Sequence, residues 1–302
     1  MTTSRGDGFA VLPVARGYVL KTRLSWRRAQ RVLRRPGLEW QAHQLMGLWR
    51  GQPPSPTILD PRVGYASFGS SLLQHQSGTI RLLAESAERW SRLDDPLRRQ
   101  STGYPINLLL PDDLRRDPRI LELALDERLL RPAAEYLGQI PRLCNLRLWW
   151  SPATDSLDGS RQFHYDHRDR RQVKVFVNLV DVDSETGPLR FMPADSCRRF
   201  NARRGYRFGR YTDQEVFDAC APSELRDSCG PIGSGVMVDT ARCMHYGSRW
   251  NTRPRFLLAV SFVRANSAQP NQCATLDSVR DELAARVYAD DPLRRFVLQA
   301  PA

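Results

Sequence analysis

The stretch that decides the fold is residues 163–193, FHYDHRDRRQVKVFVNLVDVDSETGPLRFMP. Its middle, residues 173–180, alternates as a β-strand does, and an acidic turn closed by Gly187 leads to a second apolar run. At its start, His164 and Asp166 are two residues apart, and on an extended strand this spacing points both side chains to the same side. The stretch therefore predicts a strand, a turn and a second strand, with an imidazole and a carboxylate presented together.

Outward from this stretch, the chain divides into helical and β-rich parts. Further β-rich runs are residues 142–150 (RLCNLRLWW), 235–239 (GVMVD) and 255–263 (RFLLAVSFV). Apolar residues at helical spacing occur at 24–33, 79–93, 126–137 (ended by Gly138) and 276–298. We therefore expect a single α+β domain over residues 1–302: a mainly helical support and substrate-side region at 1–140, a β-sandwich or barrel at 141–265, and a closing helix within 266–302.

The composition excludes several classes of protein. The chain of 302 residues has 41% apolar residues, enough for a proper core, and no apolar run of membrane-spanning length. Its six cysteines form no CxxC pair, which disfavours a zinc ribbon or a disulfide scaffold. With no secretory leader visible at the N-terminus, we expect a cytoplasmic protein with reduced cysteines and no membrane partner.

A net charge of +12 could attract nucleic acid, but the detail weakens that interpretation. Lys21 and Lys174 are the only lysines, so nearly all the positive charge is arginine. GC-rich codons explain such a skew more simply than a selected binding face does. Nucleic acid is therefore disfavoured as a partner but stays open, and a phosphorylated or carrier-bound small molecule fits the charge equally well.

The histidines are the clearest source of chemistry, and there are five: His43, His75, His164, His167 and His245. His245 could join His164 and Asp166 to complete two imidazoles and one carboxylate, a set that leaves positions open on Fe(II). An all-histidine or all-thiolate set would indicate zinc instead. An HxD pair alone is weak, because surface His-Asp neighbours are usually solvated. His167 lies in the charged run HRDRR, and we expect it in a solvated loop and not among the ligands.

Residues 163–193, together with 233–263 (GSGVMVDTARCMHYGSRWNTRPRFLLAVSFV) and the helix before the first long strand, resemble the phytanoyl-CoA dioxygenase family. The resemblance covers about residues 126–265 and implies a double-stranded β-helix of the jelly-roll or cupin type. It implies Fe(II) held by His164, Asp166 and His245, with 2-oxoglutarate and O2 as co-substrates and Arg255 holding the distal carboxylate. It further implies hydroxylation of a substrate with release of succinate and CO2, and the carboxylate of Asp166 favours hydroxylation over halogenation.

Other residues are candidates around the co-substrate. Arg255 begins the strand at 255–263, and strand phase favours it over Arg253 as the carboxylate clamp. Phe176 and Asn178 share one strand face and could line the co-substrate pocket, although a phenylalanine in a strand is equally often core. Ser248 is a further candidate contact through the resemblance. Three tryptophans could form pocket walls, with core packing the commoner role for each: Trp149, Trp150 and Trp250.

Two other functions are weighed against a small-molecule hydroxylase. One keeps the chemistry but makes the substrate a macromolecule, as in a hydroxylase or demethylase of nucleic acid or protein. The other is a non-catalytic ligand-binding β-barrel in which the HxD pair is incidental. A hydrolytic zinc enzyme is disfavoured, since the sequence has no HExxH or nucleophile-elbow motif. Residues 198–227, long and rich in arginine and aromatics, are a candidate lid over the site.

Overall fold

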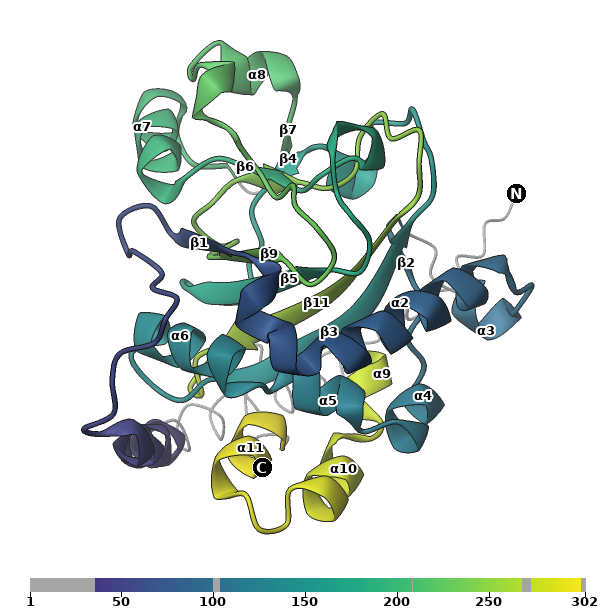
Figure 1. Ribbon diagram of the computed structural model, residues 1–302. Coiled ribbons are helices and arrows are strands. Elements are labelled where there is room, and N and C mark those ends of the chain that lie inside the picture. Colours follow the sequence, from purple (N-terminus) through teal and green to yellow (C-terminus); the bar gives the residue numbers. More distant parts are fainter. Residues whose placement is uncertain (1–35, 100–103, 208, 268–272, 300–302) are drawn as a thin grey trace, which may run out of the picture.

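A computed structural model describes residues 36–99, 104–207, 209–267 and 273–299, and its centre is a pair of antiparallel sheets (Figure 1). The major sheet has the strand order β1 (Tyr65–Phe68), β9 (Gly235–Val238), β5 (Gln172–Asn178), β11 (Arg255–Val263), β3 (Arg142–Ser151) and β2 (Ile106–Asn107). The minor sheet has the order β7 (Arg210–Tyr211), β4 (Phe163–His164), β10 (His245–Tyr246), β6 (Arg190–Phe191) and β8 (Arg226–Asp227). The expected α+β class with a β-rich centre is confirmed at this level.

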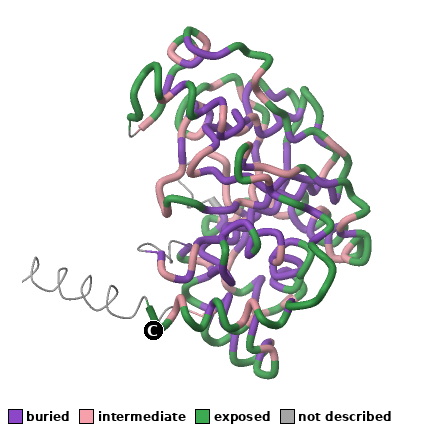
Figure 2. The backbone as a smooth tube through the Cα atoms, turned by 90° about the vertical axis from the view of Figure 1, so that its left-hand side faces the viewer, coloured by how far each residue is buried: buried purple, intermediate pink, exposed green. Residues whose placement is uncertain are grey.

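Helices cover the outer face of the major sheet, below it in Figure 1. Residues 36–46 are helical, followed by α2 (Ser77–Arg92), α3 (Pro96–Arg99), α4 (Pro111–Arg116), α5 (Arg119–Ala124), α6 (Glu127–Leu137), α9 (Ala274–Asp277), α10 (Arg280–Val287) and α11 (Pro292–Leu298). Short 3-10 turns lie at Gly47–Trp49, Ser70–Gln76, Gly159–Arg161, Ser184–Thr186 and Pro222–Glu224. Figure 2 shows buried stretches of the backbone gathered in the interior and exposed stretches mostly along the outside. Among the described residues, no helix is both long and apolar enough to cross a membrane.

Alternation along β5 and β11 gives the major sheet two different faces. Val173, Val175 and Val177 belong to the core shared with the helices. Phe176 instead packs in a second cluster that includes Phe191 of the minor sheet, so the two sheets face each other across that cluster. We call this side of the major sheet its inner face. Phe176, Asn178 and Arg255 lie on this face, whereas His164 and His245 come from the minor sheet that faces it.

The segment expected as a lid covers the outer face of the minor sheet. It contains α7 (Ala194–Arg204), β7 and α8 (Asp213–Phe217), drawn at the top of Figure 1. Its apolar side chains form a third cluster with Phe163 and Tyr165, which come from the strand that carries His164. The segment is therefore a packed layer that supports the HxD strand from behind.

The N-terminal half is less helical than the sequence suggests. β1 and β2 both come from it and extend the two edges of the major sheet, although neither shows a clear alternating pattern. α6 agrees with its expected range: Asp126 caps its start by accepting from the Arg128 N–H, and Gly138 ends it at a φ of 74°. The expected helix at 24–33 lies outside the described residues. All six cysteines are free thiols.

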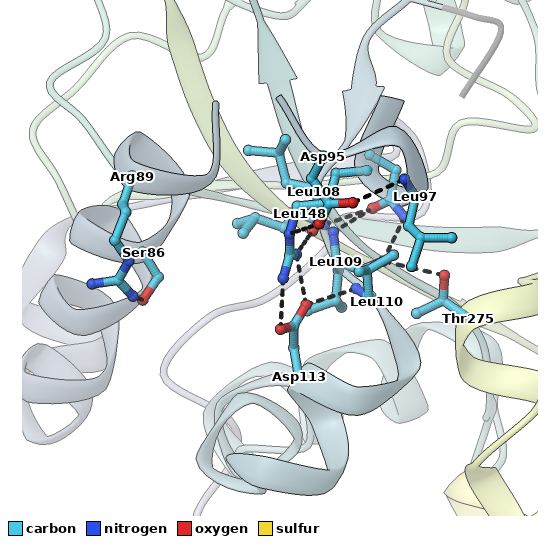
Figure 3. Close-up of polar contacts among 12 residues, drawn as sticks. Ser86, Arg89, Asp95, Leu97, Leu108, Leu109, Leu110, Asp113, Leu148 and Thr275 are labelled. Atoms are coloured by element: carbon cyan, nitrogen blue, oxygen red, sulfur yellow. Dashed lines mark hydrogen bonds and ion pairs between the residues drawn. The ribbon is translucent and has the colours of Figure 1, made fainter. Parts of the chain in front are cut away.

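A buried ion pair fastens the chain between α3 and α4 (Figure 3). Both guanidinium ends of Arg98 bond the Asp113 carboxylate, at 2.7 and 2.9 Å, and Asp113 also accepts the Leu110 N–H at 2.8 Å. Arg98 stacks on Trp90 of α2, with its Cζ 4.1 Å from the ring centroid. These contacts join the edge of the major sheet to the helical layer.

Because Arg98 and Asp113 are buried, Asp113→Ala is expected to lower the free energy of unfolding by about 2 kcal/mol, since it leaves a buried cation short of its partner. Glu88→Ala is the control, because its ion pair with Arg92 is exposed and is expected to contribute no more than about 0.5 kcal/mol. Urea unfolding of the three proteins measures both values. Equal losses in the two variants would contradict this role for the buried pair.

Candidate metal centre

Strand pairing brings the two candidate histidines together from positions far apart in the sequence. His164 of β4 and His245 of β10 are directly opposite each other, with ring centroids 4.4 Å apart. Asp166 follows β4, and its backbone N–H donates to the Thr240 carbonyl at 2.9 Å. The potential ligand atoms of these three residues all lie within 4.8 Å of one another, and no other such group occurs in the part of the chain that the structure describes.

Backbone carbonyls orient both imidazoles. Nδ1 of His164 donates to the Gln162 carbonyl at 2.8 Å, and Nδ1 of His245 donates to the Cys243 carbonyl at 3.0 Å. A carbonyl can only accept, so in the neutral rings each Nδ1 carries the proton and each Nε2 presents a lone pair. Metal-binding histidines in proteins are commonly held this way by their other ring nitrogen.

The local charges favour the protonation states that bind a divalent cation. Burial, followed by the neighbouring His164, lowers the pKa of His245 to about 3, and burial also lowers the pKa of His164. Burial alone would raise the pKa of Asp166, but Lys174 and then the two imidazoles hold it well below its usual range. The Lys174 Nζ lies 2.6 Å from Asp166 Oδ2. The site thus offers two neutral imidazoles and one ionised carboxylate.

The lowered pKa of His245 predicts that the metal-free protein becomes less stable in acid. The native state resists protonation down to a pKa of about 3, whereas the unfolded chain takes up the proton near the ordinary value of 6.5. Between these values the unfolded state binds more protons, so stability falls as the pH falls. We expect urea unfolding at pH 5 to give a free energy roughly 1–2 kcal/mol below that at pH 7, since one such group contributes up to about 1.4 kcal/mol per pH unit. His245→Asn should lose most of this difference, and a wild type equally stable at both values would contradict it.

Arg255 opens β11 on the inner face, opposite Ser151 of β3, and its side chain is only 3% exposed. Its Nε and Nη1 are buried and have no hydrogen-bond partner among the described residues. Burial lowers its pKa to about 10. Gly247 lies beside the guanidinium: a Cβ added there would be 3.7 Å from Arg255 Nη2, an ordinary van der Waals contact. A buried guanidinium with free donors favours binding of an anion. The two oxygens of a carboxylate match two parallel N–H groups of a guanidinium.

The competing Arg253 lies on the surface. It is about half exposed and pairs with Asp183 and, at 3.0 Å, with Glu185. Strand phase does not separate the two arginines, because residues two apart share a strand face. They differ because Arg253 lies before β11, across Pro254, whereas Arg255 is the first residue of that strand.

The remaining candidates have more varied positions. Phe176 packs in the cluster between the sheets. The Asn178 amide donates to Ser234 Oγ at 3.2 Å, and the Ser248 hydroxyl donates to the Gly187 carbonyl at 3.0 Å, so both hold loops of the protein itself. His167 lies outside the metal-ligand group, and its Nδ1 is 2.8 Å from the Tyr206 hydroxyl.

The three tryptophans differ as well. Trp149 packs against the cluster between the sheets and Trp150 against the helical core, whereas Trp250 is 55% exposed.

Lys174 is the site residue that sequence reasoning missed. A signal was present, because it is one of two lysines in the chain and shares its strand face with Phe176 and Asn178. Only the folded chain shows that it bonds Asp166.

No family model matches the chain, and no curated protein matches it. Solved structures do resemble it at a low level. HygX from Streptomyces hygroscopicus, with nickel and 2-oxoglutarate bound, has a TM-score of 0.45 and 20% identity over 67% of this chain and 83% of its own. The non-heme alpha ketoglutarate dependent epimerase SnoN from nogalamycin biosynthesis has a TM-score of 0.44 and 18% identity, over 67% and 79% of the two chains. EctD from S. alaskensis with bound Fe has a TM-score of 0.45 and 18% identity, over 67% and 73%. At these values the likeness carries no weight for the chemistry of this chain.

Proposed function

We propose that this protein is an Fe(II)- and 2-oxoglutarate-dependent dioxygenase that hydroxylates a small-molecule substrate. The observation that carries the proposal is the convergence of His164, Asp166 and His245, with both Nε2 atoms available and the carboxylate ionised. In this proposal the two facing sheets form a double-stranded β-helix of the phytanoyl-CoA dioxygenase type. The protein works as one domain in the cytoplasm, where its six cysteines stay reduced.

The donor set favours iron over structural zinc. Two imidazoles and one carboxylate leave positions open on an Fe(II) ion for a chelating co-substrate and oxygen. Structural zinc prefers four protein ligands, often thiolates, and the described residues bring no cysteine into this group.

Arg255 supports 2-oxoglutarate as the co-substrate. Its buried guanidinium has two nitrogen atoms without partners, and a dicarboxylate that binds the metal through one end can offer its other carboxylate to them. A buried cation without a partner costs free energy, so this arrangement is best explained by an anion that arrives with the co-substrate.

Bound Fe(II) and 2-oxoglutarate would supply the oxidising power: O2 and 2-oxoglutarate are consumed, one oxygen atom enters a C–H bond of the substrate, and succinate and CO2 leave. The protein residues bind the metal and the co-substrate and keep water away from them. His164 and His245 bind as neutral imidazoles, Lys174 fixes the Asp166 carboxylate, and Arg255 orients the co-substrate. The apolar cluster around Phe176 excludes water from the space between the sheets.

Anaerobic titration of Fe(II) and 2-oxoglutarate into the metal-free protein tests the proposal. We expect the weak visible charge-transfer band of the chelate to appear and to saturate at one equivalent of each. A well-folded protein that gives no band would refute the proposal and favour a non-catalytic ligand-binding barrel.

A further inference from the structure

Asn145, Arg147 and Trp149 follow one another along one face of β3. The proposed function gives Asn145 and Arg147 no role. Leu146 and Leu148 point into the helical core, so Asn145, Arg147 and Trp149 point the other way, toward the space between the sheets. This face of β3 lies next to the inner face of β11, which carries Arg255.

The strand register places Arg147 close to the proposed chemistry. Arg147 is directly opposite Ala259 of β11, and Ala259 is in turn opposite Phe176 of β5. Phe176 is two residues from Lys174, which bonds Asp166, so the Arg147 guanidinium lies along the same wall as the candidate metal centre.

Arg147 is held in place but has no counter-ion. Its Nε donates to Asn145 Oδ1 at 3.0 Å, and its Cζ lies 5.0 Å from the Trp149 ring centroid. No carboxylate within the described part of the chain lies within ion-pair distance of it, and its two terminal nitrogens make no hydrogen bond there. The residue is half-buried, and its guanidinium is oriented by Asn145 and Trp149.

The other charges of the inner face are accounted for. Lys174 is paired with Asp166, and on the facing minor sheet the Nδ1 of each candidate histidine donates to a backbone carbonyl. In the proposed function Arg255 is neutralised by the distal carboxylate of 2-oxoglutarate. Among the described residues of this wall, Arg147 is then a cation that no proposed component neutralises. An oriented guanidinium without a counter-ion can bind an anion through two parallel N–H groups.

We propose that the substrate carries an oxyanion, a carboxylate or a phosphate, and that Arg147 binds it, positioned by Asn145 and Trp149. This inference rests on the proposed function and names its substrate class. A fixed guanidinium favours an oxyanion because two parallel N–H groups match two oxygens of a carboxylate or phosphate. Arg210, whose backbone pairs with that of His164, adds positive charge on the opposite sheet, since its Nε donates only to the Gly159 carbonyl.

The test uses the whole chain loaded with Mn(II) and saturating 2-oxoglutarate, so that the co-substrate occupies the Arg255 site. Sulfate, as a phosphate mimic, and acetate are each titrated by calorimetry into the wild type, Arg147→Gln and Arg147→Lys. The control is Arg81→Gln, which removes one exposed arginine of α2 on the far side of the major sheet. The affinities of all four proteins for Mn(II) and 2-oxoglutarate are measured in parallel.

We expect Arg147→Gln to weaken anion binding by about 10-fold or more, the loss typical of one charge-assisted hydrogen bond or pair. Arg147→Lys should be weakened less, and Arg81→Gln should match the wild type. Metal and 2-oxoglutarate affinity should be unchanged in all variants. Tighter sulfate binding would assign a phosphorylated substrate, and tighter acetate binding a carboxylate substrate; either supports the inference.

Three results would overturn the inference: a wild type that binds neither anion, an Arg147→Gln protein that binds as the wild type does, or a loss of 2-oxoglutarate affinity in Arg147→Gln, which would place Arg147 in the co-substrate site. Failure of the proposed function is distinguishable. In that case Mn(II) and 2-oxoglutarate do not bind, while anion binding by the metal-free protein still depends on Arg147.

Discussion

His164→Ala is expected to weaken Fe(II) binding by about 100- to 1,000-fold and to abolish the charge-transfer band of the chelate at micromolar metal. A four-ligand zinc site gains roughly 10–16 kcal/mol from its metal, so one ligand is worth about 2.5–4 kcal/mol. Each factor of ten in affinity corresponds to about 1.4 kcal/mol. The neutral Nε2 of His164, already oriented by the Gln162 carbonyl, supplies one of three donors, and alanine offers no replacement. Anaerobic titration with Fe(II), and with Mn(II) followed by electron paramagnetic resonance, measures the loss.

His43→Ala is the matched control. His43 is exposed, and its Nδ1 lies 2.7 Å from the Glu39 carbonyl in the helical stretch 36–46, outside the metal-ligand group. Its removal should leave metal affinity unchanged. Equal metal affinity in His164→Ala and the wild type would exclude this centre.

Arg255→Met is expected to change two measurements in opposite directions. The dissociation constant of 2-oxoglutarate should rise by about 100-fold or more, because two charge-assisted bonds of roughly 1.5–3 kcal/mol each are lost. The free energy of unfolding of the ligand-free protein should increase by about 1 kcal/mol, since methionine replaces a buried cation with two unpartnered nitrogens. Mn(II) affinity should stay the same. Calorimetry and urea unfolding measure the three quantities.

Arg253→Met separates this effect from the loss of any neighbouring arginine. Its ion pairs with Asp183 and Glu185 are half-exposed, so we expect little change in co-substrate affinity or stability. If Arg253→Met weakens 2-oxoglutarate binding and Arg255→Met does not, the assignment of the carboxylate clamp is reversed.

The long strands could be predicted from the sequence, and the short ones could not. β5 alternates over seven residues, enough for period two to be visible, and β11 is a nine-residue, nearly continuous apolar run rich in Val and Phe, typical of a buried strand. The five strands of the minor sheet have two residues each, too few to show any period. β1 and β2 were missed for the same reason, and they join the major sheet only through partners distant in sequence.

The candidate site shows the same division. Local spacing placed His164 and Asp166 on one side. The preference for Arg255 over Arg253 follows from where the strand begins and not from strand phase, since the two residues share a phase. Which distant residue meets the HxD pair depends on the pairing of β4 with β10. The donor set and the resemblance both made His245 a candidate, but neither could show this pairing. Lys174 and Arg147 were missed because their importance comes from which charges they meet, or fail to meet, across strands.

The strands of the minor sheet are only two residues long, so metal binding can affect how firmly this sheet is held. Few backbone hydrogen bonds hold β4 to β10, yet these strands carry His164 and His245 directly across from each other. A metal ion bound by both rings would cross-link β4 and β10, which few backbone hydrogen bonds hold together. Binding of the proposed metal would then also fix the position of the minor sheet. The site between the two sheets would reach its final geometry only with the metal bound.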